Sequence, residues 1–219
     1  MFGLTIYTYF AFQSTFNMNT KDYLKDISEI KDMMNKSSRF FSLSGLSGIL
    51  AGIYAILGAV IAYYLVSISG MDYLILDGQT FNYILLDLAI VAILSILTGI
   101  ALSIKKAKSN NESLWNSTSK RLLSAFLVPL VTGGIFIIIK IHNNHYGLTG
   151  SLMLIFYGLA LVNASKYTIG NVKYLGYIEI VLGLICAAIP TYGFWFWVLG
   201  FGVMHIIYGS LIYIKHDKK

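Results

Sequence analysis

Two ionisable side chains lie deep within apolar stretches of the sequence. Glu179 falls in the run 175–191 and His205 near the middle of the run 194–214. In helices that rise 1.5 Å per residue, their depths differ by about 4 Å. Tyr54, in an earlier apolar run, lies at a similar depth. A carboxyl, an imidazole and a phenol that meet can relay protons or bind a cation, because imidazole titrates near neutrality.

These three residues predict a titratable site at the middle of a membrane. A charge held in hydrocarbon costs about 2.5–3.5 kcal/mol, so Glu179 needs a reason to be there. One interpretation is a site for protons or a small solute, made by Glu179, His205 and Tyr54. The alternative is structural: neutral Glu179 and neutral His205 satisfy each other or backbone carbonyls and hold the helices together.

A second set of polar residues lies near the ends of the apolar runs. Asp87 and Lys140 fall near ends that reach the same face of the membrane, which predicts an ion pair between them. His142 and His145 follow in a polar turn. Two imidazoles are too few to hold zinc without a third ligand, so we predict no metal site.

Motifs of soluble enzymes are missing from the sequence. It contains no GxSxG, HExxH, Walker or GxGxxG motif and no paired cysteines. The single Cys186 lies inside an apolar run and is expected to behave as a small buried hydrophobic residue. We therefore expect no cofactor, and an activity other than catalysis is favoured over an intramembrane enzyme.

The elements that must position the polar residues are membrane helices. Hydrophobic residues make up 57% of the 219-residue chain and charged residues only 12%, which excludes a soluble enzyme, a nucleic-acid-binding domain and a disulfide-stapled module. Lipid offers no partner to bare amides, so long apolar runs must be helices. We predict an all-α integral membrane protein whose six spans form three in-out-in hairpins, at 43–68, 83–104, 122–141, 148–165, 175–191 and 194–214.

The distribution of basic residues predicts the orientation. If the amino terminus is cytoplasmic, all but one of the 16 Lys and Arg residues fall in cytoplasmic segments, and the exception is Lys140. This bias follows the positive-inside rule, and it puts both termini in the cytoplasm and the Asp87–Lys140 pair at the outer rim. The net charge of +6 then favours contact with anionic lipid over nucleic acid.

Small residues in the first run predict close helix packing. Ser44, Gly48 and Gly52 recur at spacing four, with Ala51 and Ala55 beside them. Such stripes let helix backbones approach each other in lipid, so this helix is expected at the centre of the bundle; a homo-oligomer interface is the alternative. Pro129 predicts a kink or local unwinding in the third run.

The chain before the first span divides into two parts. Residues 1–17 are apolar and aromatic but lack the features of a signal peptide, so they are either an upstream extension before a second start at Met18 or an interfacial anchor. Residues 19–36 predict an amphipathic helix, which either lies on the lipid head groups or docks a cytosolic protein. We thus divide the chain into a cytoplasmic segment 1–42, a membrane domain 43–214 and a basic tail 215–219.

One stretch carries a family resemblance. The sequence SRFFSLSGLSGILAGIYAILGA at 38–59, preceded by KDISEIKDMM, resembles the start of small multispan inner-membrane proteins of bacteria. The resemblance covers mainly residues 18–66 and implies a bacterial inner membrane, without an activity, substrate or site. The sequence favours a small proton or solute translocator, and the alternative is a membrane scaffold or sensor that docks a cytosolic partner through residues 19–36.

Overall fold

The computed structural model describes Tyr23 and residues 25–30, 44–69, 78–109, 115–168 and 172–217. The chain forms two compact units, Met1–Ser38 and Arg39–Lys219. All regular elements in these described ranges are helices, and none is a strand. The prediction of an all-α protein is confirmed.

Four helices are long and apolar enough to cross a bilayer, and they identify a membrane protein. They are α3 (Gly45–Ser69), α4 (Gly78–Ser109), α5 (Ser117–His142) and the segment Pro190–Lys215. Most of their apolar side chains point away from the protein; on α4, for example, only Ala107 is buried. Without lipid around them these faces would expose a large hydrophobic surface to water, so they indicate contact with a bilayer.

Two further helices are shorter. Helix α6 (Thr149–Ala164) has 16 residues and α7 (Val172–Ala188) has 17, near the lower limit for a span. The 3₁₀ turn η1 (Ser165–Tyr167) follows α6, and a second 3₁₀ turn begins at Pro190, shortly after α7. By length and composition, the structure therefore supports four candidate membrane spans among the described residues, whereas six were expected from the sequence.

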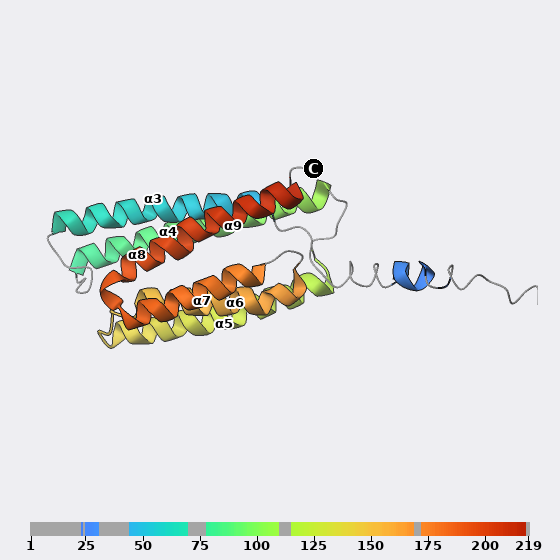
Figure 1. The fold of residues 1–219 in the computed structure, drawn as a ribbon. Coiled ribbons are helices and arrows are strands. Elements are labelled where there is room, and N and C mark those ends of the chain that lie inside the picture. Colours follow the sequence, from blue (N-terminus) through green and yellow to red (C-terminus); the bar gives the residue numbers. More distant parts are fainter. Residues whose placement is uncertain are drawn as a thin grey trace, which may run out of the picture. The chain divides into compact units, whose positions relative to one another are not determined.

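The helices of unit Arg39–Lys219 form two groups (Figure 1). In one, α3 lies between α4 and the carboxyl-terminal helix, and in the other, α6 lies between α5 and α7. The carboxyl-terminal helix begins against α6 and α7 and then continues along α3. It therefore connects the two groups, and side chains from both can meet on it.

The close contacts in both groups depend on glycine. A Cβ on Gly52 of α3 would lie 2.6 Å from the carbonyl oxygen of Gly202, and one on Gly158 of α6 would lie 2.6 Å from that of Gly176 on α7. No side chain fits at these points, so backbone packs directly on backbone, as small residues permit in lipid. Gly48 likewise faces Gly209, and Ala55 is buried. Ser44 and Ala51 of the same stripe are half-buried.

The carboxyl-terminal helix is irregular. It comprises the 3₁₀ turn η2 (Pro190–Tyr192), α8 (Gly193–Trp197), the π-helical segment η3 (Val198–Met204), α9 (His205–Ile212) and a second π segment η4 (Tyr213–Asp217). The π conformation is rare, and it is frequently found at functional sites. His205 is the first residue after η3.

Pro129 lies inside α5, and the helix continues through it from Ser117 to His142. Proline has no backbone N–H, so it leaves the carbonyl of Ala125, four residues earlier, without its usual donor. Asn163 of α6 supplies the missing bond, because its Nδ2 donates to the Ala125 oxygen at 2.8 Å. Of the kink or local unwinding expected at this proline, the unwinding is not seen, and a side chain from the neighbouring helix compensates for the lost bond.

The amino-terminal unit is described only in part. Residues 25–30 are helical, and Lys25 Nζ lies 4.0 Å from Glu29 Oε1 one turn later. The remainder of the helix predicted over 19–36, and residues 1–17, fall outside the described residues.

Candidate functional site

A buried carboxyl and a buried imidazole meet between the two groups of helices. Glu179 on α7 is 0% exposed, and His205 at the start of α9 is 7% exposed. They are the only acidic or basic side chains buried in the described ranges. Glu179 Oε1 lies 3.6 Å from His205 Nδ1, which brings these two predicted site residues together.

The hydrogen bonds of His205 define its neutral tautomer. Nδ1 lies 3.0 Å from the carbonyl oxygen of Gly200, and Nε2 lies 2.8 Å from the hydroxyl of Tyr157. A carbonyl oxygen can only accept, so Nδ1 carries the proton in this bond. In the neutral ring Nε2 is then an acceptor, and the Tyr157 hydroxyl donates to it.

Tyr157 is a candidate site residue that the sequence analysis missed. It lies near the middle of α6, packs edge-on to Phe126 at 6.1 Å between ring centroids, and lies 5.1 Å from the Phe201 ring. Phe201 in turn stacks on the His205 ring at 5.9 Å. Its position midway along an apolar run places it in the same layer of the membrane as His205, and this was the signal that could have made it a candidate beside Tyr54.

The Glu179 carboxyl occupies space that Gly200 leaves open. A Cβ on Gly200 would contact Glu179 Oε2 directly and would lie 2.5 Å from Leu154 Cδ2. Both carboxyl oxygens are buried, and neither has a hydrogen-bond partner within the described structure. A buried polar group left in this state costs about 1–3 kcal/mol. Glu179 is thus left without a hydrogen-bond partner in a closely packed site, next to the π-helical segment η3.

Tyr54, the third predicted member, lies elsewhere. Its hydroxyl is 3.3 Å from Thr98 Oγ1 on α4, so its hydrogen bond joins α3 to α4. The site that forms in the structure is therefore Glu179, His205 and Tyr157, and we call it the buried polar cluster. Tyr157 takes the position expected for Tyr54 because the His205 side chain bonds α6, whereas α3 packs against the backbone at the start of α9.

Asp87 and Lys140 are not brought together. No ion pair joins them in the part of the chain that the structure describes. Asp87 faces α3, where a Cβ on Gly58 would lie 3.1 Å from its Oδ2, and it borders a cavity of about 190 Å³. His142 and His145 are not part of any group of three potential metal ligands among the described residues.

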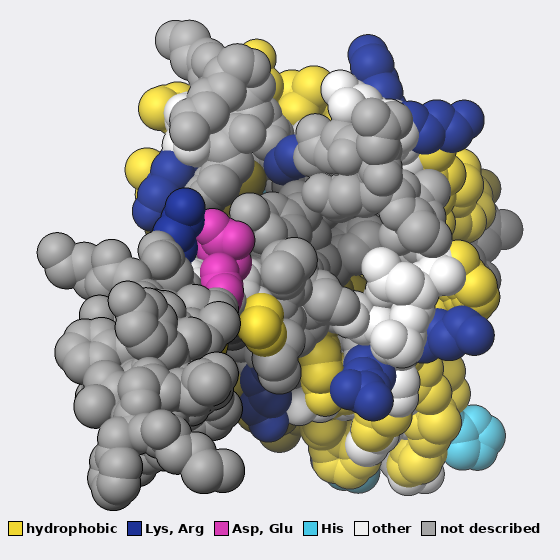
Figure 2. Space-filling view, turned by 90° about the vertical axis from the view of Figure 1, so that its right-hand side faces the viewer, with side chains coloured by type: hydrophobic (Ala, Val, Ile, Leu, Met, Phe, Trp, Pro, Cys, Tyr) yellow, Lys and Arg dark blue, Asp and Glu magenta, His cyan; other side chains and the backbone are white. Residues whose placement is uncertain are grey.

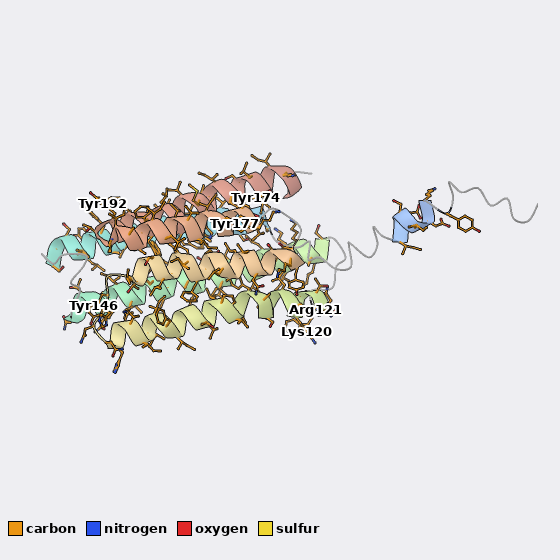
Figure 3. All side chains as sticks on the ribbon, turned by 60° about the horizontal axis from the view of Figure 1, so that its bottom comes forward. Lys120, Arg121, Tyr146, Tyr174, Tyr177 and Tyr192 are labelled. Carbon is orange, nitrogen blue, oxygen red and sulfur yellow. The ribbon has the colours of Figure 1, made fainter. Side chains whose placement is uncertain are left out.

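Basic side chains gather at one end of the helices. Lys106 and Lys108 lie in the last turn of α4, Lys120 and Arg121 in the start of α5, and Lys173 in the start of α7. Figure 2, which looks toward this end, shows Lys and Arg side chains among hydrophobic ones. Figure 3 shows Lys120 and Arg121 at this end of α5, and Tyr146 and Tyr192 at the opposite end of the helices.

Fold and site together define an all-helical membrane protein with a glutamate, histidine and tyrosine cluster enclosed by α6, α7 and α9. No protein-family model, curated protein or solved structure matches the chain. The function must therefore be argued from the geometry alone.

Proposed function

We propose that the chain crosses the bilayer six times, with both termini in the cytoplasm of a bacterium and the bundle in its inner membrane. Helices α6 and α7 would be the additional spans, since their 16 and 17 residues lie near the lower limit of about 17 and they pack within the bundle. The basic end of the helices supports the orientation, because basic residues are retained on the cytoplasmic side.

We further propose that the protein translocates protons, alone or coupled to a small solute, through the buried polar cluster. The observation that carries this proposal is that the His205 ring lies between a fully buried carboxyl on α7 and the Tyr157 hydroxyl on α6. Ionisable groups within membrane helices are expensive, and they mark proton relays and ion paths.

The hydrogen bonds suggest how a proton would move. Nδ1 already carries the proton that it donates to Gly200, so a further proton would enter the ring at Nε2, passed on by the Tyr157 hydroxyl as its oxygen takes up another. Nδ1 would then release its own proton to a Glu179 carboxylate, whose Oε1 lies 3.6 Å away. Protonation of Nε2 would reverse the Tyr157 bond, because the imidazolium donates through both nitrogens. The carboxyl is fully enclosed in this conformation, so transport requires a second conformation that opens the cluster to water.

Proton flux into liposomes tests the proposal. The purified protein is reconstituted with a pH-sensitive dye inside, and a pH gradient is imposed while valinomycin and potassium fix the membrane potential. We expect flux above that of protein-free liposomes, and its loss in Glu179→Gln, which retains the shape of the side chain but cannot carry the proton.

Tyr54→Phe is the matched control, since it removes a phenol hydroxyl that bonds Thr98 outside the cluster. It should retain the wild-type flux, whereas Tyr157→Phe should lower it. Wild-type flux that does not exceed the protein-free value, or that survives in a well-folded Glu179→Gln, would show that the cluster is structural.

A second candidate function is a membrane scaffold that holds a cytosolic protein. The observation in its favour is that Ile27 and Ile30 of the amino-terminal helix are 60% and 53% exposed. Exposed apolar residues on a charged helix suit a partner's groove or a lipid surface. Loss of a co-purifying protein from Ile27→Glu/Ile30→Glu, with unchanged flux, would favour this function.

A further inference from the structure

A half-open cavity of about 190 Å³ lies among α3, α4, α8 and the turn between α5 and α6. The buried polar cluster is not part of its lining. The lining includes Ala62, Phe81, Asp87, Tyr146, Phe194 and Trp197. The cavity is thus a separate site, and most of its lining comes from α3, α4 and the start of the carboxyl-terminal helix.

Asp87 is the only acidic or basic side chain among the described residues that line the cavity. No hydrogen bond or ion pair of its carboxyl occurs within the described ranges, and both of its oxygens lie against Gly58 of α3. A carboxylate on a membrane helix with an apolar setting calls for a counter-ion. The wall supplies none.

Four aromatic rings lie in an otherwise mostly aliphatic wall. Phe81, Tyr146, Phe194 and Trp197 come from α4, the α5–α6 turn and α8. Phe81 and Tyr146 pack edge to face with ring centroids 5.5 Å apart. The faces of aromatic rings attract ammonium groups, and this attraction is stronger where water is excluded. Rings and carboxylate together match an organic cation, whereas they repel an anion.

The volume limits the size of the ligand. An apolar cavity of about 150 Å³ accommodates benzene. At about 190 Å³, this cavity has room for one ring or a short branched chain together with an amine. A hydrated inorganic cation would leave the apolar wall unused, so the fit favours an ammonium group attached to an apolar body.

We propose that this cavity binds a small lipophilic ammonium ion, with the Asp87 carboxylate as its counter-ion and the aromatic wall around its apolar part. The proposal stands on the lining of the cavity and does not depend on proton transport. A protein that fails to move protons can still bind the amine, so the two proposals can fail separately.

Equilibrium binding tests the site in the intact protein, in lipid nanodiscs and without any gradient. The probe is benzylammonium, and isothermal titration gives its affinity. The neutral comparison compound is benzyl alcohol, which is similar in size. We expect benzylammonium to bind, and Asp87→Asn to weaken it by about tenfold or more while affinity for benzyl alcohol stays within about twofold, because only the charged compound loses a partner.

Ala62→Leu is the second variant, because it adds volume to the wall without touching the charge. It should weaken both compounds together. Benzoate should not bind the wild-type protein. Undetectable binding of benzylammonium, equal binding of benzoate, or an Asp87→Asn protein that binds benzylammonium as the wild type does would each overturn the proposal.

Discussion

Glu179 and Asp87 are both carboxyl residues on apolar helices, but their surroundings differ. Glu179 is 0% exposed and lies against Gly200 and Leu154, whereas Asp87 is half-buried and borders a cavity of about 190 Å³. Packing, more than residue type, decides what each carboxyl can meet. A closely packed site admits only a proton, which moves along hydrogen bonds, whereas a cavity admits a molecule.

The largest expected difference between the two carboxyl positions is in access to water. Starting from Cys186→Ser, which removes the native thiol, we expect Asp87→Cys to react with a water-soluble maleimide at least about a hundredfold faster than Glu179→Cys. Labelling of a buried thiol requires opening, and each 1.4 kcal/mol of opening free energy slows it about tenfold. Mass spectrometry of the detergent-solubilised protein gives both rates.

Equal labelling rates at the two positions would contradict the comparison. Cys186 itself is the internal control, because it is 1% exposed and should label as slowly as Glu179→Cys. Rapid labelling of Cys186 in the wild-type protein would mean that detergent has loosened the bundle, and the measurement would then be repeated in nanodiscs.

The next effect is the response to added volume. Gly200→Val inserts a side chain where Glu179 and Leu154 already lie, and overpacking of this kind costs about 1–3 kcal/mol. Ala62→Leu adds the same three carbons, but into the cavity, and should change stability by less than about 0.5 kcal/mol. Thermal unfolding in one detergent compares the two variants; similar losses would mean that the cavity wall is as tightly packed as the cluster.

The smallest expected effect compares two phenols. Tyr157→Phe leaves His205 Nε2 without its donor in a buried site and should destabilise the protein by about 1–2 kcal/mol. Tyr54→Phe breaks a longer, partly buried bond to Thr98 and should cost about 0.5 kcal/mol. Thermal unfolding measures the loss of stability in both variants. A larger loss in Tyr54→Phe than in Tyr157→Phe would contradict the placement of Tyr157, and not Tyr54, in the buried polar cluster.

Composition and hydropathy were sufficient to predict helices and membrane contact, because a bilayer permits few other structures. The pairing of Glu179 with His205 followed from depth along two helices joined by a short turn. The prediction that Tyr54 joins them rested on depth alone, and the structure places Tyr157 there instead. Depth restricts a residue to a layer of the membrane, but which helices are neighbours within that layer depends on contacts that no single sequence pattern encodes.

Two local features also escaped the sequence analysis for physical reasons. The π segment Val198–Met204 has an ordinary apolar sequence, and it packs against α7 and against α3, which is distant in the sequence. At Pro129, the predicted unwinding is avoided because Asn163 donates to the Ala125 carbonyl. That bond joins residues on separate helices, so local rules for proline could not anticipate it.

The π segment also determines how the cluster responds to a change in chain length. A π turn holds more residues than an α turn, so the segment Val198–Met204 already accommodates extra chain length, and loss of one residue there can be absorbed by a return to α-helix. One further residue inserted between Met204 and the end of α9 has no such outlet and would turn the residues beyond it by about 100°, while leaving the hydropathy profile almost unchanged. Relatives that look identical in membrane topology could differ in whether they possess the cluster at all.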